Sequence, residues 1–120
     1  DGTCIRDYIH VTDLANAHLL ALRRLRAGGG SIVANCGYGR GYSVLEVLDC
    51  VQQVVGRPLP IRYGQRRAGD AVAIVANADK ARAEFGWQPQ HDDLAEIVSS
   101  ALAWEDSLSR RNSPARSSGT

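Results

Sequence analysis

The chain has 120 residues, a formal net charge of +1 and 44% apolar residues. This length corresponds to one small domain or to part of a larger one, and the apolar content is sufficient for a core. The near-neutral charge gives no indication of binding to nucleic acid or to an anionic membrane, and no apolar stretch approaches the roughly 20 residues of a membrane helix.

The cysteines and histidines predict neither a disulfide framework nor a metal site. Cys4, Cys36 and Cys50 are odd in number and form no Cys-x-x-Cys motif, which predicts reduced, mostly buried thiols and a cytoplasmic protein. His18 has no ligand partner at metal spacing, so we expect it to be packed rather than metal-bound. The chain shows no signal peptide, and it opens with Asp1 rather than Met, so we expect that an N-terminal segment is missing.

The first half of the chain alternates extended and helical patterns. Residues 6–11 alternate polar and apolar side chains, and Asp13 begins a helical pattern that a run of three glycines ends. Residues 31–36 (SIVANC) predict a short buried strand. Residues 44–55 form the clearest amphipathic pattern, and the glycine that follows them predicts the end of that helix.

The second half contains shorter elements. We predict a strand over 59–63, a polar loop over 66–70, an apolar segment over 72–76, a helix capped by Asn77 that ends before Gly86, and a helix from Asp92 or Asp93 to about 108. Residues 109–120 (SRRNSPARSSGT) predict a disordered polar tail, so the folded part is expected to be 1–108. The alternation indicates an α/β or α+β unit with too few strands for a complete doubly wound sheet.

A glycine-rich turn joins the predicted strand at 31–36 to the predicted helix at 44–55, in the segment CGYGRGYSVLEV (36–47). A dinucleotide-binding fingerprint needs a third glycine five residues after the first, where this chain has Tyr42. The acidic residue that should follow the next strand is also absent. Ser43 and Glu46 instead have the spacing of a helix capping box, so we interpret the glycines as structural.

The best polar candidates for chemistry are arginines in a loop. Arg66 and Arg67 precede Gly69 and Asp70, and this spacing alone fits either a solvated loop or an anion site. The sequence has no nucleophile elbow, zinc-protease motif or P-loop. No tyrosine is followed by lysine at the fourth position, so the acid/base pair of short-chain dehydrogenases is absent.

Four segments together resemble UDP-glucose 4-epimerases, in that family's order and spacing. They are DGTCIRDYIHVTDLANAHLLAL, GYGRGYSVLEV, RRAGD followed by VANADKARAEFGWQP, and DDLAEIVSSALAWE. Related nucleotide-sugar dehydratases and decarboxylases share this arrangement of segments but usually differ from this chain in the first segment. The resemblance implies an α/β fold, namely the C-terminal substrate-binding part of an extended short-chain dehydrogenase/reductase of Rossmann type, without the N-terminal dinucleotide-binding part.

The resemblance also implies an activity for the complete parent protein. Such enzymes interconvert UDP-glucose and UDP-galactose by NAD-dependent oxidation and re-reduction at C4 of the sugar. We expect the parent to bind NAD and a UDP-sugar and to form a homodimer, whereas this chain holds no catalytic, NAD-binding or metal-binding residue and is inactive alone. The alternatives are a fragment of another nucleotide-sugar epimerase, dehydratase or decarboxylase, and a non-catalytic binding module or pseudogene product.

The resemblance assigns site roles to four residues of this chain. Arg6 and Arg67 correspond to two arginines that bind the diphosphate, and Asp70 to the residue that accepts hydrogen bonds from the ribose. Ile74 corresponds to a residue near the C2 substituent of the sugar, and its size predicts a preference for non-acetylated sugars. Arg66 is expected to be structural.

Other expected roles are structural. His10 and Asp13 are expected to fix the turn into the first helix, and Trp87 and Trp104 to lie in the core. In family structures residues 6–37 lie against the nucleotide-binding sheet, so we expect this part of the chain to lose burial here.

Overall fold

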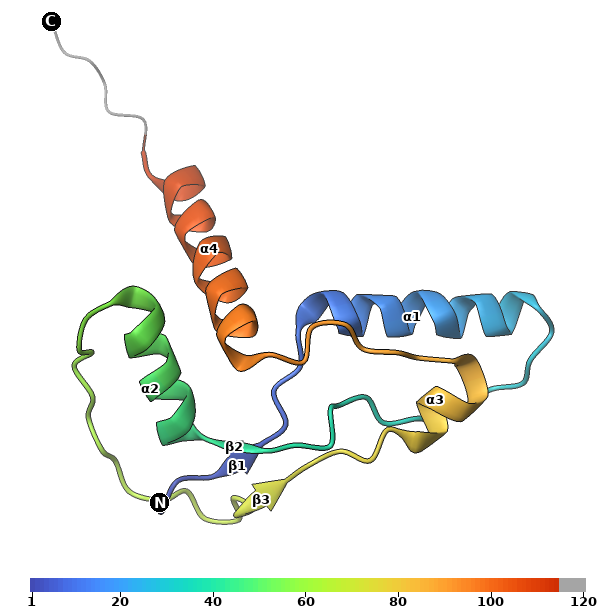
Figure 1. Cartoon of the computed structure of the whole chain (residues 1–120), viewed down its shortest axis with the longest axis horizontal. Helices are drawn as coiled ribbons and strands as arrows, with labels where there is room; N and C mark the ends of the chain where they lie inside the picture. The colour runs from blue at the N-terminus through green and yellow to red at the C-terminus, as the bar shows by residue number, and fades with distance from the viewer. Residues whose placement is uncertain (115–120) are drawn as a thin grey trace, which may run out of the picture.

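The computed structural model describes residues 1–114 as four helices around three very short strands (Figure 1). In chain order the elements are β1 (Ile5–Arg6), α1 (Val11–Arg26), β2 (Tyr42–Ser43), α2 (Val44–Val55), β3 (Ala73–Ile74), α3 (Asp79–Phe85) and α4 (Leu94–Asn112). The strands form one sheet in the order β2-β1-β3, with β1 antiparallel to β2 and parallel to β3. The predicted α/β class is confirmed.

The helices form two pairs on either side of the strands. Helix α1 contacts α3, helix α2 contacts α4, and Figure 1 shows the first pair on the right and the second on the left. The central strand β1 therefore links the two halves through its pairs with β2 and β3. Over the described range, no helix combines the length and the apolar character needed to cross a bilayer.

Local sequence signals explain where α1 and α2 begin and end. The imidazole Nδ1 of His10 accepts a hydrogen bond from the Thr12 N–H at 3.0 Å and caps α1. Ser43 and Glu46 form the predicted capping box of α2, with each side chain accepting from the backbone N–H of the other. Gly56 ends α2 in the left-handed conformation, with φ of 74°.

Helix α4 starts as predicted but is longer, whereas the N-cap of α3 is Ala78 rather than the predicted Asn77 and makes no side-chain capping bond. The Asn77 side chain accepts from the Asp79 N–H at 3.0 Å, and Gly86 ends α3 with φ of 66°. The carboxylate of Asp93 accepts from the Glu96 N–H at 3.1 Å and caps α4. Helix α4 continues to Asn112, so residues 109–112 are helical where the disordered tail was expected to begin. Residues 115–120 of that tail lie outside the described range.

Two predicted strands do not form. Residues 31–36 and 59–63 are irregular, and no backbone–backbone hydrogen bond of residues 31–36 is found within the described chain. Val33, in the middle of the first segment, is 84% exposed. The prediction of a buried strand here is therefore wrong, because a strand needs a neighbouring strand and residues 1–114 provide none.

The core is small and lies between α1 and α3. Ala17, Ala78, Ala81 and Trp87 are its buried members. The ring of Trp87 is fully buried, and its Nε1–H donates to the backbone oxygen of Asp13 at 3.0 Å. Trp104 was expected in the core and this is wrong, because α4 packs against α2 while the Trp104 side chain stays 53% exposed beside the Arg111 guanidinium.

The glycine-rich turn has a packing role. A Cβ on Gly41 would overlap the Ile5 side chain and lie 2.9 Å from a methyl carbon of Val75. A Cβ on Gly37 would lie 2.6 Å from a carboxylate oxygen of Asp7. The turn therefore needs glycine because it passes close to β1 and to the segment after β3.

Candidate functional site

Strand β1 places Arg6 directly beside β3, with Arg6 opposite Ile74 in the register. One nitrogen of the guanidinium, Nη1, donates to the backbone oxygens of Ile5 and Ala71 at 2.7 and 3.0 Å. The other, Nη2, lies 3.1 Å from Oδ1 of Asp70. Because three acceptors hold it, the Arg6 guanidinium has a fixed position at the edge of the sheet.

The loop before β3 supplies the remaining charges. Nη2 of Arg67 lies 3.7 Å from Oδ2 of Asp70, and the Arg67 side chain is 89% exposed. The Asp70 N–H donates to the Arg67 backbone oxygen at 3.3 Å, and Gly69 between them has φ of 79°, so a tight turn presents both side chains. Arg66 does not contact Asp70 directly: its Nη2 lies 3.8 Å from Sγ of Cys4, which in turn lies 3.8 Å from Oδ2 of Asp70.

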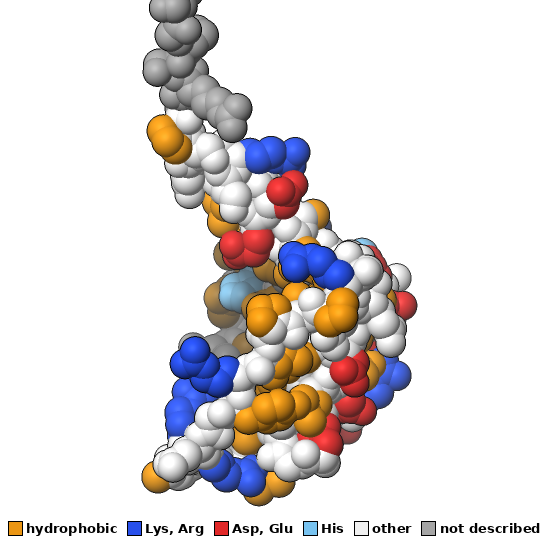
Figure 2. Space-filling view, turned by 90° about the vertical axis from the view of Figure 1, so that its left-hand side faces the viewer, with side chains coloured by type: hydrophobic (Ala, Val, Ile, Leu, Met, Phe, Trp, Pro, Cys, Tyr) orange, Lys and Arg blue, Asp and Glu red, His pale blue; other side chains and the backbone are white. Residues whose placement is uncertain are grey.

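We call Arg6, Arg66, Arg67 and Asp70 the arginine cluster. Three guanidinium groups and one carboxylate leave a formal charge of +2 in this group. All residues from Pro60 to Gly69 are exposed, and Figure 2 shows basic side chains along one edge of the face that bears this loop. Guanidinium groups of this kind bind phosphate oxygens through charge-assisted hydrogen bonds, so the cluster is suited to a phosphorylated ligand.

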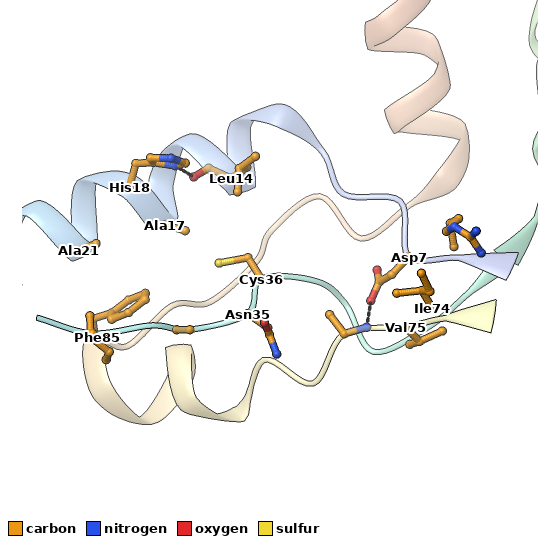
Figure 3. Close-up of a pocket in the computed structure, with 14 residues that line it drawn as sticks. Asp7, Leu14, Ala17, His18, Ala21, Asn35, Cys36, Ile74, Val75 and Phe85 are labelled. Atoms are coloured by element: carbon orange, nitrogen blue, oxygen red, sulfur yellow. Dashed lines mark hydrogen bonds between the residues drawn. The ribbon is translucent and has the colours of Figure 1, made fainter. Parts of the chain in front are cut away.

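An open groove of about 700 Å³ adjoins the cluster (Figure 3). Arg6 and Ile74 line one end, and α1, the 32–36 segment and Phe85 line the rest. Ile74 is 55% exposed, so it faces open space rather than a core. The structure thus brings all four predicted site residues together, with Arg6 common to the cluster and the groove.

Asp7 occupies the position that an anion would take at the glycine-rich turn. Its carboxylate accepts from the backbone N–H groups of Tyr38 and Gly39 at 3.0 Å each, and of Ala76 at 3.2 Å. Figure 3 shows the last of these bonds. A pyrophosphate would need such free N–H groups, so the turn does not fit the pyrophosphate of NAD.

A second polar group, absent from the sequence prediction except for Asp13, lies at the start of α1. The Asp13 carboxylate is 2% exposed and accepts from Tyr38 Oη at 2.5 Å and from the N–H groups of Gln90 and His91 at 2.9 and 3.0 Å. The Tyr38 oxygen in turn accepts from the His10 N–H at 3.0 Å. We call Asp13, Tyr38, Gln90 and His91 the Asp13 junction. It joins three parts of the chain that are distant in sequence.

Burial and hydrogen bonding set the ionisation of this junction. Burial acts to raise the pKa of Asp13, but the hydrogen bonds from Gln90, Tyr38 and His91 outweigh it, so its pKa lies below the usual 3.8. Burial, together with the bond to Asp13, raises the pKa of Tyr38 well above that of a free phenol. Tyr38 therefore stays protonated near neutral pH and cannot serve as a tyrosinate base.

The cysteines of the chain are free thiols. Burial raises the pKa of Cys36 and Cys50, which makes both poor nucleophiles. Cys4 lies at the arginine cluster, with its Sγ 3.8 Å from Oδ2 of Asp70. All three are only partly buried, so the prediction of mostly buried thiols is wrong.

Among residues 1–114, one group of side chains consists of residue types that commonly bind metal ions. His10, His91 and Glu96 place one ligand atom each within 4.8 Å of one another, and the two imidazole rings stack at 4.6 Å. Nδ1 of His10 already caps α1, and Nδ1 of His91 lies 2.5 Å from Oε1 of Glu96. Because Nδ1 of His10 accepts from the Thr12 N–H and the His91 ring pairs with Glu96, we interpret the group as a junction between α1 and α4.

Comparison with known proteins identifies the relatives of this fold and site. A sequence model of the NAD dependent epimerase/dehydratase family matches residues 1–37. The UDP-glucose 4-epimerase of Azospirillum brasilense is 58% identical over 108 residues, which are 90% of this chain and 31% of that protein.

Two solved structures extend the match to three dimensions. The UDP-glucose 4-epimerase of Stenotrophomonas maltophila, with bound NAD and formylated UDP-arabinopyranose, superposes with a TM-score of 0.84 at 42% identity over 92% of this chain and 33% of that one. The enzyme of Bifidobacterium longum, in complex with NAD+ and UDP, gives 0.81 at 40% identity over 89% and 31%. This chain is therefore similar over most of its length to UDP-glucose 4-epimerases, and it spans about a third of the length of those it matches.

Proposed function

We propose that the chain is the UDP-sugar-binding segment of an NAD-dependent UDP-glucose 4-epimerase. The observation that carries this proposal is the arginine cluster beside the open groove, in a chain whose relatives include an enzyme solved with UDP. The complete enzyme would interconvert UDP-glucose and UDP-galactose. NAD, when bound to the complete enzyme, supplies the reversible oxidation at C4 of the sugar.

The residues of this chain would bind and orient the nucleotide. Arg6 and Arg67 would contact the diphosphate from two sides of the loop, with Arg6 as the fixed group and Arg67 as the adjustable one. Asp70, whose side chain is 27% exposed, would accept hydrogen bonds from the ribose hydroxyls. Ile74 at the mouth of the groove would border the sugar.

The chemistry at C4 requires residues outside this chain. The sequence lacks a Tyr-x-x-x-Lys pair, Tyr38 is held protonated, and Asp7 fills the glycine-rich turn. The remainder of the enzyme would supply NAD binding and proton transfer and would pack against α1. The complete protein would be cytoplasmic and homodimeric, as reduced thiols and the family resemblance suggest.

A chimera tests this function directly. This chain replaces the matching segment of the Azospirillum brasilense enzyme, to which it is 58% identical. We expect the chimera to convert UDP-galactose to UDP-glucose, measured by a coupled assay, whereas the 120-residue chain alone has no activity. A folded chimera that binds NAD but neither binds nor converts UDP-galactose would contradict the proposal.

A further inference from the structure

The carboxylate of Asp7 connects three segments of the chain at one end of the open groove. Its Oδ1 accepts from the Tyr38 N–H at 3.0 Å, and its Oδ2 accepts from the N–H groups of Gly39 and Ala76 at 3.0 and 3.2 Å. Tyr38 and Gly39 belong to the glycine-rich turn, and Ala76 follows β3. One side chain therefore joins the end of β1 to the turn and to the chain after β3.

Backbone pairing alone holds these segments together over a short length. Strands β1 and β3 have two residues each, and their parallel pairing ends at Arg6 and Ile74. The bond from the Ala76 N–H to Asp7 lies just beyond this pair, so the carboxylate continues the connection where the strands stop. Figure 3 shows this bond as a dashed line from Asp7, at the end of β1, to the chain after β3.

We propose that Asp7 is a positioning residue for UDP-sugar binding and that it acts through Arg6. Nη1 of Arg6 donates to the Ala71 backbone oxygen at 3.0 Å, so the place of the guanidinium depends on where β1 lies relative to the chain around β3. Asp7 fixes that relation through its bond to Ala76 and does not itself contact the ligand. The role rests on the proposed function, which assigns nothing to Asp7.

The surroundings of Asp7 indicate a geometric role rather than a charge effect. Among residues 1–114, Asp7 forms no ion pair, and its three acceptor contacts are all with backbone N–H groups. The turn also packs directly on it, since a Cβ on Gly37 would lie 2.6 Å from Oδ2 of Asp7 and 2.5 Å from the Ala76 side chain. A side chain at position 37 would therefore displace the carboxylate or the segment that it holds.

The test is Asp7→Asn in the chimera, alone and combined with Arg6→Ala. Asparagine keeps the shape of the side chain but has one acceptor oxygen, so at least one of the three N–H bonds is lost. We expect the Kd for UDP to rise about tenfold in titration calorimetry. Turnover at saturating UDP-galactose should change by less than about threefold, because the residues that act at C4 lie outside this chain. In the Arg6→Ala background, Asp7→Asn should change the Kd by less than about twofold.

A second variant displaces the Asp7 carboxylate without removing it. Gly37→Ala should weaken UDP binding in the same Arg6-dependent way, whereas Gly64→Ala, where a Cβ meets nothing within 4 Å, should not. Asp13→Asn is the control for stability, because Asp13 also accepts from backbone N–H groups but lies at the start of α1. Thermal unfolding should show that it destabilises the chimera, and the Kd of the folded chimera for UDP should change by less than about twofold.

Three results would overturn the positioning role. The first is an unchanged Kd for UDP in folded Asp7→Asn, and the second is the same loss with and without Arg6. The third is that neither Asp7→Asn nor Gly37→Ala gives a folded chimera, since Asp7 would then maintain the fold as Asp13 does. An active chimera with any of these results keeps the proposed function, whereas an unsubstituted chimera that is inactive and binds no UDP overturns both.

Discussion

The Asp13 junction and the arginine cluster are both built on one carboxylate, but the two carboxylates have opposite surroundings. Asp13 is 2% exposed and accepts from neutral donors, namely one phenol and two backbone N–H groups. The Asp70 side chain is 27% exposed and lies between two cations. Neutral donors in a buried place have no alternative partner, whereas cations near the surface can also contact water or another anion. The difference separates a carboxylate that maintains the fold from one that is available to a ligand.

The largest expected effect comes from breaking the junction. Asp13→Asn replaces one acceptor oxygen with a donor, so at least one of the Gln90, His91 and Tyr38 donors is left unsatisfied in a buried place. We expect a loss of about 3 kcal/mol in the free energy of unfolding. Urea unfolding followed by the fluorescence of Trp87 measures it, in a Trp104→Phe background that removes the exposed indole.

The Asp13 junction also makes the stability of the chain depend on pH, with stability decreasing toward acid pH. The pKa of Asp13 in the folded chain lies below 3.8, its value in the unfolded chain, so the unfolded chain binds more protons. The contribution of Asp13 is therefore complete above about pH 4 and is lost as the pH falls through the folded pKa. Stability measured in this acid range should fall less steeply in Asp13→Asn. Parallel pH profiles would assign the acid sensitivity to other carboxylates.

A somewhat smaller effect is expected at the glycine-rich turn, which connects the two regions. Gly41→Ala forces a Cβ against Ile5 and Val75, and we expect it to lower the stability by about 2 kcal/mol. Gly64→Ala is the matched control, because a Cβ there meets nothing within 4 Å. If both variants unfold at the same urea concentration, the close approach of the turn to β1 is not a constraint.

Within the arginine cluster, the effects on UDP binding should follow the contacts of each guanidinium. In the chimera we expect Arg6→Ala to weaken UDP binding by about 2 kcal/mol, Arg67→Ala by about 1 kcal/mol, and Arg66→Ala by less than about 0.5 kcal/mol. The order follows the contacts of each guanidinium. Arg6 is held by backbone oxygens, Arg67 is exposed near Asp70, and Arg66 is directed to Cys4. Equal losses at Arg66 and Arg67 in a UDP titration would contradict the assignment of the loop.

An effect of similar size is expected at the sugar. Ile74→Ser should raise kcat/KM for UDP-N-acetylglucosamine relative to UDP-glucose in the chimera, and Ile74→Tyr should lower it, each by about tenfold at most. A hydrophobic boundary discriminates mainly by size, which limits the change. An unchanged ratio in both variants would remove Ile74, which lies at the mouth of the groove, from the sugar pocket.

Local signals predicted the helices well because helices depend on neighbours in sequence. The capping box at Ser43, the stop at Gly56 and the cap at Asp93 all lie within a few residues of the structure that they determine. The end of α4 was less predictable, because the polar residues 109–112 continue a helix through its own backbone bonds. The polar side chains of residues 109–112 indicate that the segment is exposed to solvent, but they do not indicate whether its backbone is helical or disordered.

Features that depend on distant residues were harder to predict. The roles of His10 and Asp13 at the turn into α1 followed from the family resemblance, but the bond from Tyr38 to Asp13 spans 25 residues and has no local signal. Trp104 has a large apolar side chain of the kind expected in a core, and only the packing of α4 shows that it is exposed. The site residues came from the resemblance, since their spacing alone favoured a solvated loop over an anion site.

The unpaired segment at residues 31–36 has a consequence for strand pairing. Among the described residues its backbone groups have no backbone partner and Val33 is 84% exposed, so a further strand could pair with it without displacing an existing one.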